Sequence, residues 1–183
     1  MQPHAVKIRK EVSRGNEACY QRKERMKGID ILKLVTSVIL CQIAGFLGSF
    51  FTTPAIPTWY RTLNKPFFTP PNWVFSPVWI ILFIMMGISL FFVWRKPDHP
   101  QFKPALIFFF VQLILNVLWS IVFFGLRSPF LGLLDIVALW ISILLTIQYS
   151  IKVSKFAGVL LIPYLLWVGF ASLLNFSLWI LNR

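Results

Sequence analysis

Three tryptophans that lie deep in long apolar stretches, Trp79, Trp119 and Trp167, are the residues of this sequence best suited to contact a ligand. Polar and aromatic side chains accompany them at intervals of three or four residues, which places them on one face of a helix. Apolar walls with a few polar groups are the usual composition of a ligand pocket. The predicted faces consist of Gln112, Asn116, Trp119 and Phe123; of Asp135, Ser142, Thr146 and Tyr149; and of Pro163, Trp167, Ala171 and Asn175.

Polar groups in apolar stretches are expected to face one another, because exposing them to lipid is costly. This predicts one pocket between helices, but each amide or hydroxyl can instead join two helices by a hydrogen bond. Trp73, Trp94 and Trp179 lie at the ends of the stretches and fit an interfacial belt. Asp135 is the only charged residue in the last two stretches, so both an ion pair with Arg127 and a functional role stay open.

Other catalytic chemistry has few residues to work with. Cys19 and Cys41 form no C-x-x-C motif, and His4 and His99 lie in polar segments away from any carboxylate cluster. Neither a histidine-ligated metal nor a Ser-His-Asp site has the groups it needs. The sequence therefore predicts no metal site and no obligatory cofactor.

The positive charge is concentrated at the N-terminus. Lysine and arginine number 18 against six acidic residues, giving a net charge of +12, and eight of the basic residues lie in the first 28 positions. Nucleic-acid binding requires a basic face on a folded domain. This pattern instead indicates membrane topology signals and contact with anionic headgroups, and no nucleic-acid partner is expected.

The composition excludes an ordinary water-soluble enzyme. Of the 183 residues, 57% are hydrophobic and only 13% are charged, and a soluble domain of this size cannot hide so much apolar surface. Backbone groups in lipid must bond within their own segment, so apolar runs of about 20 residues become helices. We predict an all-α integral membrane protein, a five-transmembrane-helix bundle over residues 29–183 after a basic tail at 1–28. The expected spans are 29–51, 73–94, 104–126, 130–151 and 156–181.

The first connector, residues 52–72, is expected to form a lid over the helix ends. It contains five prolines and several aromatic residues, whereas a flexible linker is rich in glycine and serine. Long ordered loops often carry function. The third and fourth connectors are short, which forces antiparallel neighbours, and Pro163 predicts a kink in the fifth span.

The orientation follows from the distribution of basic residues. The tail, second connector and fourth connector carry 13 of them, against four on the first connector, third connector and C-terminus. By the positive-inside rule, the N-terminus is cytoplasmic in a bacterial inner membrane. The tail is read as a topology anchor, with a targeting or regulatory arm as the alternative.

Several motifs in this order and spacing resemble those of the TspO/MBR family, the tryptophan-rich sensory proteins and translocator (peripheral-type benzodiazepine receptor) proteins. The resemblance extends over about residues 30–182. The matching motifs are Trp59-Tyr60, Lys65-Pro66, Pro70-Pro71-Asn72-Trp73, Pro77-Val78-Trp79, Met86-Gly87, Leu115-Asn116 with Trp119, Phe123-Phe124-Gly125-Leu126-Arg127, Asp135, and Pro163-Tyr164-Leu165-Leu166-Trp167 with Ala171 and Leu174-Asn175.

The resemblance implies five transmembrane helices and a pocket closed by the first loop. Its implied ligands are protoporphyrin IX and haem, sterols such as cholesterol in some members, and isoquinoline carboxamide and benzodiazepine drugs. The implied ligand contacts are Trp59, Trp79, Asn116, Trp119, Trp167 and Ala171. The predicted site also takes in Tyr60, Pro70, Phe123 and Asp135.

Two departures from the family pattern bear on partners. Phe176 stands where the family's C-terminal sterol-recognition stretch has a tyrosine, so only weak sterol or lipid binding is expected. The third span lacks the small-x-x-x-small seam of some dimeric members, which leaves a homodimer open and its interface unassigned.

Three functions are carried forward. The leading hypothesis is a membrane receptor or sensor that binds tetrapyrroles and regulates porphyrin homeostasis or a stress response. The alternative is a transporter of porphyrins or sterols, although no inverted repeat is evident. The third is light- and oxygen-dependent porphyrin degradation, for which the resemblance makes Trp79 and Trp167 the candidate reactive groups.

Overall fold

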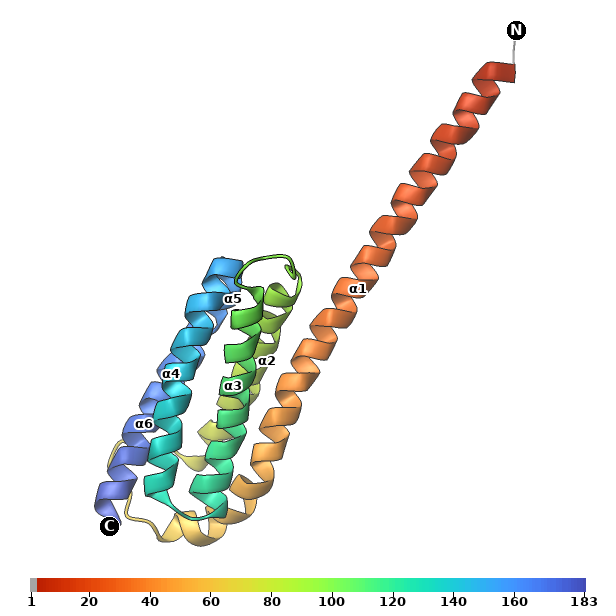
Figure 1. The fold of residues 1–183 in the computed structure, drawn as a ribbon. Helices are drawn as coiled ribbons and strands as arrows, with labels where there is room; N and C mark the ends of the chain where they lie inside the picture. Colours follow the sequence, from red (N-terminus) through yellow and green to blue (C-terminus); the bar gives the residue numbers. More distant parts are fainter. Residues whose placement is uncertain (1–2) are drawn as a thin grey trace.

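The chain folds into a bundle of antiparallel helices (Figure 1). The computed structural model describes residues 3–183, with side chains from residue 28 onward, so the basic side chains of the tail lie outside the described part. The described residues contain no β-strand. The helices are α1 (Pro3–Ala55), α2 (Asn72–Trp94), α3 (Phe102–Ser120), α4 (Pro129–Val153), α5 (Lys155–Leu160) and α6 (Ile162–Leu181), with π-helical segments η1 (Ile56–Tyr60) and η2 (Ile121–Gly125).

Five segments of the described chain are long and apolar enough to cross a membrane, which confirms the predicted fold class. They are Gly28–Tyr60, Asn72–Trp94, Phe102–Gly125, Pro129–Val153 and Lys155–Leu181. The protein is therefore a multi-pass membrane protein. The N-terminal part of α1 extends beyond the bundle, and the first loop and the C-terminus lie at the opposite end (Figure 1), which is called the lid side below.

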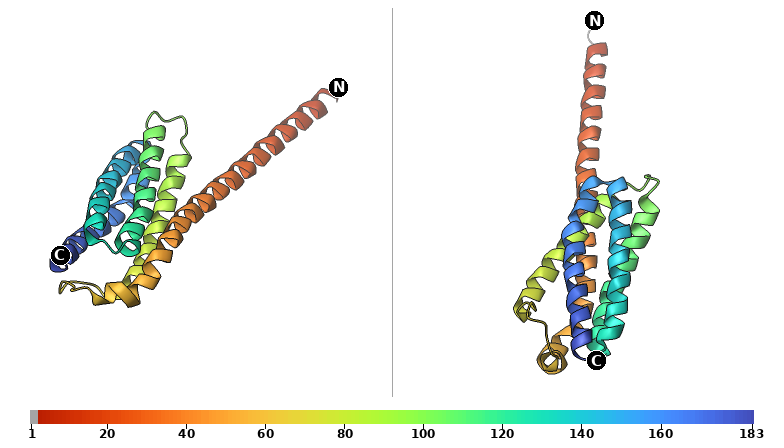
Figure 2. Two further views of the ribbon diagram at one scale, coloured as in Figure 1. Left: turned by 60° about the horizontal axis from the view of Figure 1, so that its bottom comes forward. Right: turned by 90° about the vertical axis from the view of Figure 1, so that its left-hand side faces the viewer.

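The helices form a closed ring. In ring order α1 packs on α2, α2 on α5, the α5–α6 pair on α4, α4 on α3, and α3 again on α1. Helix α2 contacts α5 at the N-terminal side of the bundle but tilts away from α6 towards the lid side (Figure 2). This divergence opens space inside the lid-side half of the ring.

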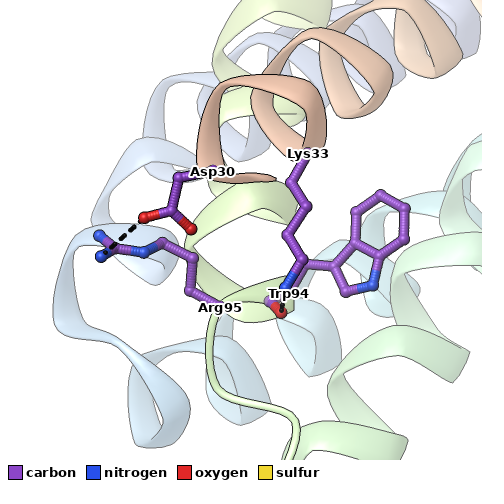
Figure 3. Close-up of polar contacts among 4 residues, drawn as sticks. All are labelled: Asp30, Lys33, Trp94 and Arg95. Carbon is purple, nitrogen blue, oxygen red and sulfur yellow. Dashed lines mark hydrogen bonds and ion pairs between the residues drawn. The ribbon is translucent and has the colours of Figure 1, made fainter. Parts of the chain in front are cut away.

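Helices α1 and α2 approach very closely at a glycine. A Cβ placed on Gly87 would lie 2.5 Å from the Cα of Val38, so only glycine fits this crossing. At the N-terminal side, Arg95 pairs with Asp30 at 3.1 Å, and Lys33 Nζ donates to the Trp94 carbonyl at 3.5 Å (Figure 3). The glycine crossing and these two polar contacts thus hold α1 against α2.

The predicted kink in the fifth span is confirmed. The span breaks into α5 and α6 at Leu161, and Pro163 occupies the first turn of α6, where its missing N–H costs little. Ser89 Oγ, fully buried on α2, donates to the Ala157 carbonyl at 2.7 Å. The break lets the short α5 pack against α2 while α6 follows a separate course.

The first span is longer than the sequence indicated. Its helix continues past residue 51 through η1 to Tyr60, so only residues 61–71, the first loop below, separate it from α2. Pro54 and Pro57 cannot donate backbone hydrogen bonds. The chain stays helical across them by widening into the π-helical turn η1, where the Thr58 hydroxyl donates to the Pro54 carbonyl at 2.8 Å.

Candidate ligand-binding cavity

A cavity of about 410 Å³ lies within the lid-side half of the bundle. Pockets for small ligands range from roughly 300 to 1,000 Å³. Its wall is contributed by α1, η1, α2, α3, η2 and α6, and most of the lining atoms are apolar. The cavity therefore occupies the space that the divergence of α2 from α6 opens.

The three deep tryptophans line this one cavity from three different helices. Trp79 comes from α2, Trp119 from α3 and Trp167 from α6. Trp119 stacks on Phe123, with ring centroids 5.0 Å apart and an interplanar angle of 17°. Trp167 meets Phe75 edge to face at 5.9 Å. Packing among these rings fixes their orientation, so the cavity has rigid aromatic walls.

A hydrogen-bond chain holds the indole of Trp119. Its Nε1 donates to Asn175 Oδ1 at 3.1 Å, and Asn175 Nδ2 donates to the Pro129 carbonyl at 2.7 Å. Gly132 lies against the same residues, since a Cβ there would be 3.0 Å from Asn175 Oδ1. The link joins α3, α4 and α6 beside the cavity.

A second chain centres on Tyr164, whose side chain is fully buried. Asn116 Nδ2 donates to the Tyr164 hydroxyl at 3.0 Å, and that hydroxyl donates to Gln112 Oε1 at 2.9 Å. Asn116 lines the cavity, whereas Gln112 does not. Gln112 thus joins two helices. Asn116 presents its amide at the cavity wall, and the hydrogen bond to Tyr164 sets the orientation of that amide.

Most of the predicted site residues meet at the cavity. Those that line it are Tyr60, Trp79, Asn116, Trp119, Phe123, Trp167 and Ala171. Trp59, Pro70 and Asp135 do not line it. Trp59 instead packs edge to face on Phe123 at 5.5 Å and on Phe124 at 6.4 Å, behind the wall. Trp59 therefore supports the cavity from outside.

Of the two roles left open for Asp135, the ion pair with Arg127 is not formed. Arg127 is exposed at the turn before α4. One carboxylate oxygen of Asp135 is buried and has no hydrogen-bond partner among the described residues. Asp135 turns inward, whereas Arg127 turns outward.

Several lining residues were missing from the predicted site. Gln42, Asn72 and Asn175 bring amide groups to the cavity, and Gln42 Nε2 also donates to the Ile80 carbonyl at 3.1 Å. Asn175 lies on the predicted helical face, together with Trp167 and Ala171. Gln42 is a polar residue within a span, a signal that could have identified it.

Among the residues that the structure describes, no group of three or more histidine, cysteine or acidic side chains is placed to hold a metal ion. The chemistry available at the cavity is therefore that of indole rings, amides and hydroxyls. Such groups suit binding of a largely apolar molecule with a few polar atoms.

A bundle of five membrane-spanning segments, four of which line an aromatic cavity, defines a polytopic α-helical membrane protein with an internal site. The chain belongs to the TspO/MBR family, whose sequence profile matches residues 37–180. It is 49% identical over 156 residues to the tryptophan-rich protein TspO of Archaeoglobus fulgidus, covering 84% of this chain and 99% of that protein.

More distant relatives extend the comparison. The chain is 38% identical over 145 residues to the protein CrtK of Rhodobacter capsulatus, covering 79% of this chain and 89% of the relative. It is 35% identical over 136 residues to the translocator protein of Homo sapiens, covering 73% and 80%. The family match confirms the resemblance found from the sequence motifs. It places the protein among membrane sensory and translocator proteins.

Proposed function

We propose that the protein is a membrane receptor that binds tetrapyrroles, protoporphyrin IX or haem, in the tryptophan-lined cavity. In this role it senses porphyrin levels and regulates porphyrin homeostasis or a stress response. The observation that supports the proposal is that Trp79, Trp119 and Trp167 line one cavity from three helices. A flat aromatic macrocycle gains stacking and edge-to-face contacts from such rings.

Quenching of tryptophan fluorescence by protoporphyrin IX tests this proposal. Wild-type protein in lipid nanodiscs should quench saturably, and Trp79→Phe with Trp167→Phe should bind about tenfold more weakly, because two indole contacts are reduced. The matched control is Trp73→Phe with Trp140→Phe, whose side chains are 74% and 36% exposed and do not line the cavity. Equal weakening in both variants, or no saturable quenching at all, would contradict the proposal.

Transport is the alternative function, and the translocator names of several relatives favour testing it. Proteoliposomes with a protein that only binds porphyrin should retain no more labelled porphyrin than the protein has binding sites. Uptake well above the amount of protein, abolished by Trp79→Phe with Trp167→Phe, would replace the receptor proposal with a transporter of porphyrins or sterols.

Assistance in porphyrin breakdown is compatible with the same cavity. Trp79 and Trp167 lie on the wall, where an indole beside a light-excited porphyrin can donate an electron while molecular oxygen acts as the oxidant. Illumination of the protein–porphyrin complex in air should then produce a bilin-like absorption that depends on both tryptophans. Tight binding without such a product would exclude porphyrin breakdown and retain only the receptor function.

The proposed orientation places the N-terminus in the cytoplasm of a bacterial inner membrane, by the excess of basic residues on that side. Labelling of introduced cysteines by an impermeant reagent in intact cells checks it. A cysteine at Thr69 in the first loop should react from outside, and one at Gln101 between α2 and α3 should be protected. A homodimer and weak sterol or lipid binding are further proposals for this membrane domain.

A further inference from the structure

The lid side of the protein carries basic residues without acidic side chains. Arg61 and Lys65 lie on the first loop, Arg127 on the third connector and Arg183 at the end of α6, and these segments contain no aspartate or glutamate. Among the described side chains, the single ion pair is that of Asp30 with Arg95, at the opposite end of the bundle. The lid-side cations therefore have no side-chain counterion there.

Tertiary contacts bring part of this charge to the end of the cavity. Asn64 and Asn182 form two hydrogen bonds, from the Asn64 backbone N–H to Asn182 Oδ1 at 2.9 Å and from Asn182 Nδ2 to the Asn64 carbonyl at 3.0 Å. The first loop is thereby fixed to the end of α6, where the loop passes the C-terminus (Figure 1). Lys65 and Arg183 are far apart in sequence, but each follows a residue of this contact, so both lie where the first loop meets the end of α6.

Lys65 lies next to a residue of the cavity wall, although neither Lys65 nor Arg61 lines the cavity itself. Lys65 Nζ lies 4.9 Å from the ring centroid of Tyr60, which is 5% exposed and lines the cavity. The ammonium group bonds the carbonyls of Arg61 and Leu63 at 3.3 and 3.2 Å. Since an ammonium group has three N–H donors, one remains for a further acceptor. The guanidinium side chain of Arg61 is exposed beside it.

We propose that Arg61 and Lys65 bind the anionic groups of a ligand whose apolar body occupies the cavity. This rests on the proposed function, and it specifies that the ligand is an amphipathic anion with its charged edge at the lid side. Carboxylates of a tetrapyrrole and the phosphate of a lipid share this chemistry. The apolar wall lowers the local dielectric and strengthens charge-assisted hydrogen bonds to either group.

Binding of protoporphyrin IX and of its dimethyl ester, which lacks ionised carboxylates, tests the proposal in nanodiscs of zwitterionic lipid. Arg61→Gln with Lys65→Gln should weaken binding of the acid about 3- to 10-fold, as expected for two partly exposed ion pairs. Raising the salt concentration should weaken binding of the acid to wild type and should have little effect on binding of the ester. The matched control is Lys103→Gln with Lys155→Gln, two exposed lysines on the opposite side, which should bind the acid like wild type.

The outcomes separate this proposal from the proposed function. Unchanged binding of the acid by Arg61→Gln with Lys65→Gln, or equal weakening of acid and ester, overturns the anionic site while leaving the cavity as a porphyrin site. No saturable binding of either compound to wild type overturns the proposed function itself. Unfolding temperatures matching wild type confirm that each variant is folded.

A lipid arm identifies the source of the anion. If Arg61 and Lys65 bind the carboxylates of the cavity ligand, protoporphyrin IX should bind to wild type equally well in nanodiscs that contain phosphatidylglycerol. If the anionic lipid competes, wild-type affinity for the acid falls to that of Arg61→Gln with Lys65→Gln, and the site is a lipid-phosphate site of the same chemistry.

Discussion

The close crossing of α1 and α2 predicts a large effect from a very small change, Gly87→Ala. The added methyl group would lie 2.5 Å from the Cα of Val38 and 2.9 Å from its backbone nitrogen. Both neighbours are backbone atoms, which cannot rotate away as a side chain can. The two helices must therefore separate by about 1 Å to restore ordinary contact, which loosens packing along the crossing.

The expected cost follows from two opposing terms. Overpacking against rigid neighbours costs up to about 3 kcal/mol, whereas alanine is favoured over glycine within a helix by about 1 kcal/mol. The net destabilisation is therefore about 2 kcal/mol. For a chain of this size it corresponds to a fall in unfolding temperature of roughly 4–8 °C.

Thermal unfolding of the purified protein in detergent measures this shift. The matched control is Gly28→Ala, where nothing lies within 4 Å of the added methyl group, so unfolding temperature should stay the same or rise slightly. Protoporphyrin binding should also weaken in Gly87→Ala, because α1 and α2 both line the cavity. An unfolding temperature for Gly87→Ala at or above that of Gly28→Ala would refute the tight crossing.

Two further predictions concern polar contacts. Tyr164→Phe removes the hydroxyl between Asn116 and Gln112, leaving buried groups unpaired; we expect about 1–3 kcal/mol of destabilisation and weaker ligand binding, measured by thermal unfolding and fluorescence quenching. Retention of wild-type values would show that these amides find other partners. Asp30→Asn breaks the ion pair with Arg95, whose side chains are 37% and 48% exposed, and should cost less than about 1 kcal/mol, an effect that disappears in high salt. A larger loss that persists in high salt would contradict this surface assignment.

The end of the first span shows where local reasoning fails. The sequence predicts a first span over 29–51 and assigns the proline-containing residues 52–72 to a lid, since proline disfavours the helix interior. In the folded protein, the helix continues to Tyr60 through a π-helical turn. Packing of Trp59 against Phe123 and Phe124 adds a long-range contribution that no local pattern contains.

The sequence by itself determined the membrane location, the all-α class, the number of spans, the family and the inward faces that carry Asn116, Trp119 and Trp167. Those features depend on hydropathy and helical spacing, which sum over neighbouring residues. Only the tertiary structure decided that α2 diverges from α6 to open the cavity, that Tyr164 orients Asn116, and that the first loop is fixed to the end of α6. Each of these depends on how whole helices cross, and crossing is set by side-chain interlocking between segments far apart in the chain.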